Sequence, residues 1–257
     1  MNIFKQLVKS LYSPKDIAKF RFQGIGKTIL YVFFLVLISL IPTAISITMF
    51  TNTAIEEGKQ TIAEDLPDFT INNGKLTTDS NEPVEVRKSN ITFIVDSTGK
   101  IKADDLSQET NAIALLQNEF AVVSVGNIQT TPYSMLEGLN LDNEQMIDFL
   151  DQMDSLKGIF LPVIILILYL FSSAMAFIKV SIFAFIGLLF ANILKRKLTY
   201  RHSFRLTAYS ITLATIFFSI MNLLNTFIPG ALLLDWIVTG LMLYLSIKEI
   251  PQKRLSK

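Results

Sequence analysis

Cysteine is absent from this chain of 257 residues, and histidine occurs once, at position 202. Without cysteine there can be no disulfide framework, no thiolate metal site and no thiol nucleophile. This one histidine lies in a basic loop, which argues against a histidine-based triad, and a histidine metal cluster needs more than one. Charged residues are also scarce, at 18%, whereas 51% of the residues are hydrophobic. A soluble domain rarely combines these two fractions, so the composition indicates a membrane protein with several spans.

The charges that are present are segregated along the chain. Residues 51–157 contain 19 acidic and 7 basic residues, a net charge of −12. The remaining residues contain 16 basic and 3 acidic ones, a net charge of +13. Such blocks of opposite sign separate an acidic soluble segment from basic segments that flank apolar runs.

The longest apolar run is Ile159–Leu194, and it ends at Lys195-Arg196-Lys197. A run of this kind predicts a membrane helix, because in hydrocarbon only a helix satisfies its own backbone polar groups. At 1.5 Å per residue it would reach roughly 54 Å, against about 30 Å of hydrocarbon. It is therefore one long tilted helix, a span with an interfacial piece, or two short spans. Two crossings would leave the most basic loop outside the cell, so the positive-inside rule favours one crossing.

The predicted fold is an α-helical polytopic membrane protein with four transmembrane helices and an inserted small extracytoplasmic α+β domain. The same rule places both termini in the cytoplasm and residues 51–157 outside it. The predicted segments are a cytoplasmic amphipathic basic segment (1–27), the first span (28–50), the acidic mixed α+β domain (51–157), a long second span (158–194), a basic cytoplasmic loop (195–203), the third span (204–227), the fourth span (231–247) and a basic cytoplasmic tail (248–257).

The first twelve residues have the periodicity of an amphipathic helix, with Phe4, Leu7, Val8, Leu11 and Tyr12 on one face. Such a helix can lie among the inner lipid headgroups or pack on the cytoplasmic loops of the protein itself, and we expect the first. Basic side chains of this surface and of the loop after the second span are then expected to contact headgroups: Lys5, Lys9, Lys195, Arg196, Lys197, Arg201 and Arg205.

The acidic segment has the turn and strand chemistry of a small mixed sheet flanked by helices. Asn72-Asn73-Gly74 separates two short β-prone runs and predicts a hairpin. Further strands are expected at 83–86, 91–95 and 121–125. Two helical segments, 55–66 and 142–156, are expected to extend the adjoining membrane helices outward as stalks.

Among the polar residues within the predicted spans, four are candidates for a functional role: Lys179, Asn222, Asn225 and Asp235. An ionisable residue in a membrane span is costly and therefore a candidate functional group. We expect Asp235 to face Asn222 or Asn225 across a turn at Pro229-Gly230, and Lys179 to reach toward the inner headgroups. A role in transport or ligand binding is the alternative to these structural roles.

Several motifs resemble a family of integral membrane proteins of Gram-positive bacteria, catalogued as a domain of unknown function and in part described as maltodextrin-utilisation proteins. The motifs are Asn2-Ile3-Phe4-Lys5-Gln6, Ser10-Leu11-Tyr12-Ser13-Pro14-Lys15, residues 20–28, Phe93-Ile94-Val95-Asp96 and Tyr200-Arg201-His202-Ser203-Phe204-Arg205. The resemblance covers most of the chain and implies a bacterial plasma membrane protein with a link to carbohydrate uptake. The C-terminal half is also similar to the Yip-type superfamily, whose members usually have five spans rather than four. Neither resemblance supplies catalytic residues.

These observations favour a non-enzymatic accessory or sensor protein, without cofactors, whose extracytoplasmic domain binds a partner or ligand. The expected partners are the lipid bilayer and a membrane protein such as a sugar transporter, and no nucleic acid. The alternatives are a small transporter or transporter subunit that uses Asp235 and Lys179, and a membrane enzyme that works with carboxylates alone.

Overall fold

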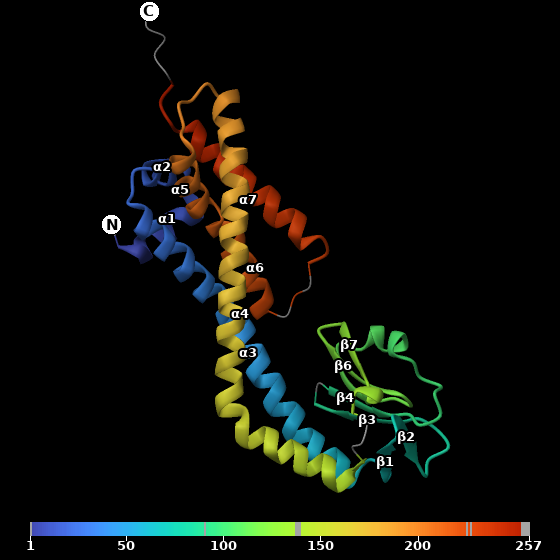
Figure 1. Ribbon diagram of the computed structural model, residues 1–257. Coiled ribbons are helices and arrows are strands. Elements are labelled where there is room, and N and C mark those ends of the chain that lie inside the picture. Colours follow the sequence, from blue (N-terminus) through green and yellow to red (C-terminus); the bar gives the residue numbers. More distant parts are fainter. Residues whose placement is uncertain (1, 90, 137–139, 225, 227, 253–257) are drawn as a thin grey trace, which may run out of the picture. The chain divides into compact units, whose positions relative to one another are not determined.

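The computed structural model describes residues 2–89, 91–136, 140–224, 226 and 228–252 (Figure 1). The chain divides into two compact units, one of Met1–Ser46 with Pro162–Lys257 and one of Ile47–Leu161. We call them the helical unit and the sheet unit and describe each by itself. Two helices, α3 (Ile25–Glu64) and α4 (Asn143–Ile193), contribute residues to both units.

The helical unit buries one apolar core among all of its helices. It contains parts of α3 and α4, and in addition α1 (Ile3–Tyr12), α2 (Pro14–Phe20), α5 (Tyr200–Ser210), α6 (Thr212–Leu223) and α7 (Ala231–Lys248). Ser13 begins α2 by accepting a hydrogen bond from the Asp16 N–H, and Pro14 occupies the first helical position. This is the cap that a Ser-Pro pair predicts. Val32, Phe183, Leu206 and Leu243 come from four different helices and are all buried in the core.

Four helical segments are long and apolar enough to cross a membrane: α3, α4, Tyr200–Leu223 and α7. In the most apolar part of α4 only 11% of the residues are buried inside the protein. Large exposed apolar surfaces are rare on soluble proteins and mark surfaces that contact another apolar phase. The number of candidate spans and the presence of a small sheet unit agree with the predicted fold class.

The longest apolar run lies in one continuous helix, so the alternative of two short spans is wrong. The helix begins at Asn143 and α3 continues to Glu64, which confirms helical structure in the two predicted stalks. The third apolar helix begins at Tyr200, four residues before the predicted start, and a turn at Ile211 separates α5 from α6.

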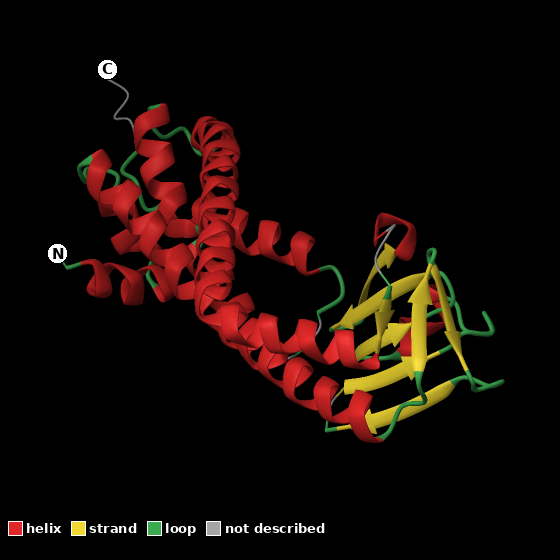
Figure 2. Ribbon diagram, turned by 60° about the horizontal axis from the view of Figure 1, so that its bottom comes forward, coloured by secondary structure: helices red, strands yellow, loops and turns green. Residues whose placement is uncertain are grey.

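The sheet unit contains two separate sheets (Figure 2). A three-stranded antiparallel sheet has the order β2-β1-β8, and a five-stranded mixed sheet has the order β3-β4-β5-β6-β7, in which only β4 and β5 are parallel. The strands are β1 (Phe69–Asn72), β2 (Lys75–Thr78), β3 (Val84–Lys88), β4 (Ile91–Val95), β5 (Asn111–Leu115), β6 (Glu119–Ser124), β7 (Asn127–Pro132) and β8 (Leu141–Asp142).

The predicted hairpin is confirmed. Asn72 pairs with Lys75, and the two residues between them, Asn73 and Gly74, both have positive φ angles of 51° and 75°. Two successive left-handed residues form the turn whose twist matches that of the strands. The predicted strands at 83–86, 91–95 and 121–125 correspond to β3, β4 and β6, whereas β5, β7 and β8 were not predicted.

Strand β4 is buried on both faces and contributes to both apolar clusters of the sheet unit. Val95 packs with Ile62, Phe69 and Leu115 on one side, and Ile94 packs with Leu106 in a second apolar cluster. Leu106 belongs to the short 3-10 helix η1 (Ala103–Gln108), which lies in the connection between β4 and β5. A parallel pair needs such a crossover connection, and here it covers the second face of the sheet.

The buried carboxylate of Asp96 organises the start of this crossover. Its Oδ1 accepts hydrogen bonds from the Thr98 N–H (2.8 Å) and hydroxyl (2.6 Å), and its Oδ2 accepts one from the Ile101 N–H (2.7 Å). Burial alone would raise the pKa of Asp96, but these hydrogen bonds outweigh burial and hold the pKa below its ordinary value. The turn Asp96-Ser97-Thr98-Gly99 is therefore fixed by its first side chain.

Replacing Asp96 by alanine is expected to destabilise the sheet unit by about 1–3 kcal/mol, because buried N–H groups lose their acceptor. The folded-state pKa lies below the unfolded one, so this contribution is present above the ordinary Asp pKa of about 3.9 and is lost as the pH falls through the folded value. Thermal unfolding of the wild type and of D96A between pH 3 and pH 7 measures both effects. An equal difference in stability at all these pH values would contradict the assignment.

Candidate functional site

The helical unit contains an ion pair between two apolar helices. Lys179 of α4 donates to Asp235 of α7 across 2.6 Å, and the two side chains are 17% and 20% exposed. An ion pair with so little exposure to water has weak solvent screening and stays closely coupled. The structure therefore pairs Lys179 and Asp235, two of the four candidate residues within the predicted spans.

A groove of about 430 Å³ lies beside this ion pair. It is lined by residues of α3, α6 and α7: Ser39, Thr215, Phe218, Ser219, Asn222, Ala231, Leu232 and Asp235. Hydroxyl and amide groups on otherwise apolar helices give it a polar wall, which can hold a small polar molecule or a polar side chain of another helix.

Asn222 does not serve as the hydrogen-bond partner of Asp235. Its Nδ2 donates to the Thr43 hydroxyl of α3 across 3.0 Å, whereas Asp235 accepts from Lys179. The expected pairing of Asp235 with Asn222, and the expected extension of Lys179 toward headgroups, are therefore wrong. The reason is physical: an opposite charge across the helix interface outweighs a neutral amide. Asn225 lies outside the described residues.

Three of the seven basic residues predicted to contact headgroups bind other groups within the helical unit. Lys9 donates to Asp16 Oδ2 across 2.8 Å. The hydrogen bonds from Lys9 and Lys19 hold the pKa of Asp16 well below its ordinary value. Arg196 donates to the Lys248 carbonyl (3.1 Å), and Arg205 donates to the Arg21 carbonyl (2.9 Å). These three predicted headgroup residues thus hold neighbouring segments together, while the other four have exposed side chains: Lys5, Lys195, Lys197 and Arg201.

The same unit contains a buried polar cluster that the sequence analysis missed. Gln6 and Ser10 of α1 are 3% and 0% exposed, and the Tyr209 hydroxyl donates to Gln6 Oε1 (3.2 Å). The hydroxyls of Tyr31 and Thr212 share a hydrogen bond of 2.6 Å. The apolar face of α1 is the more conspicuous pattern in the sequence, yet Phe4, Val8 and Tyr12 are exposed. Gln6 and Ser10 lie four residues apart on the opposite face of the helix, and this spacing is the sequence signal that could have indicated a buried polar face.

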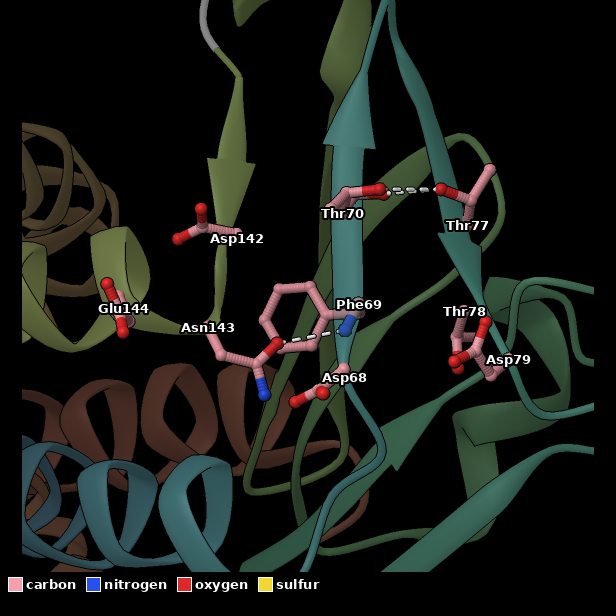
Figure 3. A pocket seen from close by; sticks show the side chains of 9 residues that line it. All are labelled: Asp68, Phe69, Thr70, Thr77, Thr78, Asp79, Asp142, Asn143 and Glu144. Carbon is pink, nitrogen blue, oxygen red and sulfur yellow. Dashed lines mark hydrogen bonds between the residues drawn. The ribbon is translucent and has the colours of Figure 1, made fainter.

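The sheet unit has an acidic groove of about 430 Å³ beside its three-stranded sheet. Figure 3 shows its lining residues: Asp68, Phe69, Thr70, Thr77, Thr78, Asp79, Asp142, Asn143 and Glu144. Asn143 accepts a hydrogen bond from the Phe69 N–H (2.9 Å), and the Thr70 and Thr77 hydroxyls share one of 2.7 Å. These bonds fix the walls, and four carboxylates give the groove its charge. A concave surface lined by one sign of charge attracts ligands of the opposite sign.

Within the part of the chain that the structure describes, no three carboxylate, histidine or cysteine side chains are grouped so that they could hold a metal ion.

Comparison with known proteins gives a family but no activity. No curated protein and no solved structure matches the chain. Residues 4–247 match the family described as "Protein of unknown function (DUF1189)". This match includes both units and every candidate site described above, so the chain belongs to the DUF1189 family.

Proposed function

We propose that this protein is a non-enzymatic, multi-pass protein of a bacterial plasma membrane whose sheet unit lies outside the cytoplasm and binds a partner or ligand. The observation that carries the proposal is the continuity of α3 and α4. Each combines a stretch long and apolar enough to span a membrane with residues of the sheet unit's own core, Ile62 from α3 and Met146 and Leu150 from α4. Binding to the sheet unit would therefore act directly on two membrane helices, as a sensor or accessory subunit requires.

The proposed topology draws support from the basic end of the helical unit. Arg205 of α5 contacts Arg21 before α3, and Arg196 after α4 contacts Lys248 at the end of α7. We call the part of the unit formed by these segments its basic end. Four spans and the positive-inside rule would place that end in the cytoplasm. The exposed Phe4, Val8 and Tyr12 of α1 would then lie among the inner lipid headgroups, next to basic side chains.

The acidic groove is the surface at which we expect a partner to bind. Asp68 and Asp79 are exposed there, and no hydrogen bond or ion pair to other described residues occupies them. A partner with basic or other positively charged groups fits this surface best. A sugar transporter as that partner, and a role in carbohydrate uptake, follow from the family resemblance in the sequence motifs.

The test is crosslinking and affinity purification of the tagged full-length protein from its native membrane, followed by mass spectrometry. We expect the wild type to recover a defined membrane protein, and the double variant D68N/D79N to lose it because the groove is partly neutralised. The matched control is E85Q/D104N, which removes two charges from exposed positions elsewhere in the sheet unit. Recovery of the tagged protein alone would contradict the proposal of a partner at the groove. Equal recovery of the partner with both double variants would contradict it as well.

A second function, transport as a carrier or as a transporter subunit, is favoured by one specific observation. The Lys179–Asp235 pair adjoins a groove lined by hydroxyl and amide groups, and charged pairs in membrane helices often mark substrate or proton pathways. This function requires the two charges themselves, whereas the accessory function requires only that the helices stay packed. Replacing both charges together separates the two.

A further inference from the structure

The sheet unit contains a second cavity, of about 140 Å³, whose chemistry is the opposite of that of the acidic groove. Its walls come from α3, α4 and the five-stranded sheet, and its lining residues are all apolar: Ala54, Ile55, Gly58, Ile62, Leu66, Phe93, Ile94, Val95, Ile113, Leu115, Phe120, Met146, Phe149 and Leu150. The cavity therefore lies between the two helices that enter the sheet unit and the face of the sheet they cover.

Water is a poor occupant for this cavity. A buried water needs two to four polar partners, and apolar cavities of similar size, about 150 Å³, stay dry and take up benzene or xenon. Hydrocarbon is thus the chemical class that fits the lining. Phe149 is 52% exposed although it lines the cavity, so an apolar side chain lies where the cavity meets the surface.

The helices that form the cavity also identify a source of hydrocarbon. On α3 the lining begins at Ala54, four residues after the predicted first span ends at Phe50, which is about 6 Å along a helix. On α4, Phe149 and Leu150 precede the apolar run that starts at Ile159 by about 14 Å. If these helices cross a bilayer, the cavity lies close to the lipid acyl chains along both helices.

We propose that this cavity binds the terminal part of one acyl chain of a membrane lipid, inserted between α3, α4 and the five-stranded sheet. The inference rests on the proposed membrane insertion of α3 and α4 and does not depend on the acidic groove. An acyl chain there would contact both helices and the sheet at once, so lipid would form part of the connection between the sheet unit and its membrane helices.

Tryptophan quenching by lipids with brominated acyl chains tests this site in the full-length protein. The only tryptophan, Trp236, is first replaced by phenylalanine. In that background F149W places a reporter at the cavity, and F171W places one on the exposed apolar surface of α4. In vesicles of brominated phosphatidylcholine we expect both reporters to lose fluorescence relative to vesicles of the unbrominated lipid. Q152W, exposed and nearer the apolar run than Phe149, is expected to lose less than F149W.

Gly58 supplies a matched pair of variants that fill the cavity to different extents. A Cβ at Gly58 would meet Leu150 Cδ1 at 3.5 Å and Phe93 Cε1 at 3.7 Å, which is ordinary contact. G58A is therefore expected to keep the quenching of F149W, whereas the larger side chain of G58L is expected to abolish it. A54L fills the cavity from the next turn of α3 and serves as a second variant if G58L does not fold.

Each outcome decides the inference. Quenching of F149W that persists in both folded filling variants would overturn it, as would quenching of Q152W as strong as that of F149W, because lipid would then contact the outside of the unit. Quenching of F171W without quenching of F149W would overturn it while leaving the proposed membrane insertion in place. A lack of quenching at F171W would overturn the membrane insertion itself, and this inference with it.

Discussion

Replacing Asp235 by asparagine is expected to destabilise the helical unit by about 3–5 kcal/mol, because it leaves the Lys179 ammonium charged and without its partner between two apolar helices. Removing only one member of a poorly solvated pair forfeits the attraction but keeps the desolvation cost of the other. Denaturation in detergent, compared with the wild type under identical conditions, measures this loss. K179M is expected to destabilise for the same reason.

Two further variants separate the charge pair from its surroundings. N222A removes one neutral hydrogen bond, to Thr43, on the same groove and is expected to cost only about 1 kcal/mol. The double variant K179M/D235L removes both charges and is expected to recover most of the stability lost in D235N, because a packed apolar pair replaces the ion pair without leaving an uncompensated charge. A double variant less stable than D235N would contradict this account of the pair.

The same double variant decides between the two proposed functions. If the pair holds α4 against α7 and does nothing else, a stable K179M/D235L protein keeps partner recovery and cellular sugar uptake. If uptake is lost while partner recovery, expression and stability are normal, the charges themselves take part in transport. The wild type and N222A provide the reference uptake.

Replacing Gly187 by alanine is expected to destabilise the helical unit by about 1–3 kcal/mol, the typical cost of forcing extra volume into a packed core. Gly187 lies on α4 where that helix meets α5 and α7. A Cβ there would overlap Ser203 Oγ, and it would lie only 3.3 Å from Leu243 Cδ2. Ser203 cannot simply move away, because its hydroxyl donates to the Ala184 carbonyl across 2.6 Å in a fully buried site. The midpoint of thermal unfolding in detergent measures the effect.

Controls on the same helix and on its neighbour isolate the cause. Gly158 of α4 has open space around it, and a Cβ at Gly240 of α7 would meet Phe183 at an ordinary 3.6 Å. G158A and G240A are therefore expected to be neutral or slightly stabilising, since alanine is the better helix former. S203A should partly rescue G187A by removing the overlapping oxygen. If G187A is as stable as G240A, the close approach of α4 to α5 does not exist.

Much of this architecture could be predicted from the sequence, because its signals are local. The apolar runs required helices of membrane length, and the Asn73-Gly74 pair required a hairpin between β1 and β2. Strand β4 could also be predicted from a local signal. A continuous run of β-branched and aromatic residues is typical of a strand buried on both faces.

What could not be predicted depends on partners far away in the chain. β5 is rich in alanine and begins with asparagine, so its strand propensity is low, and only pairing with β4 and β6 makes it a strand. The pairing of Lys179 with Asp235 joins residues 56 apart on helices whose rotation about their axes no local pattern reveals. The apolar cavity likewise exists only where α3, α4 and the sheet meet, because each of its residues looks like ordinary core in the sequence.

The buried polar side of α1 has a consequence for synthesis. The hydrogen-bond partner of Gln6 is Tyr209, 203 residues later in the chain. In α3, Tyr31 likewise shares a hydrogen bond with Thr212, 181 residues later. At about 5–20 residues per second, a ribosome needs on the order of 10 to 40 seconds to make that length of chain. The first helix is thus made well before the Tyr209 hydroxyl that binds its Gln6 side chain. Docking of α1 against Tyr209 therefore belongs among the later steps of folding.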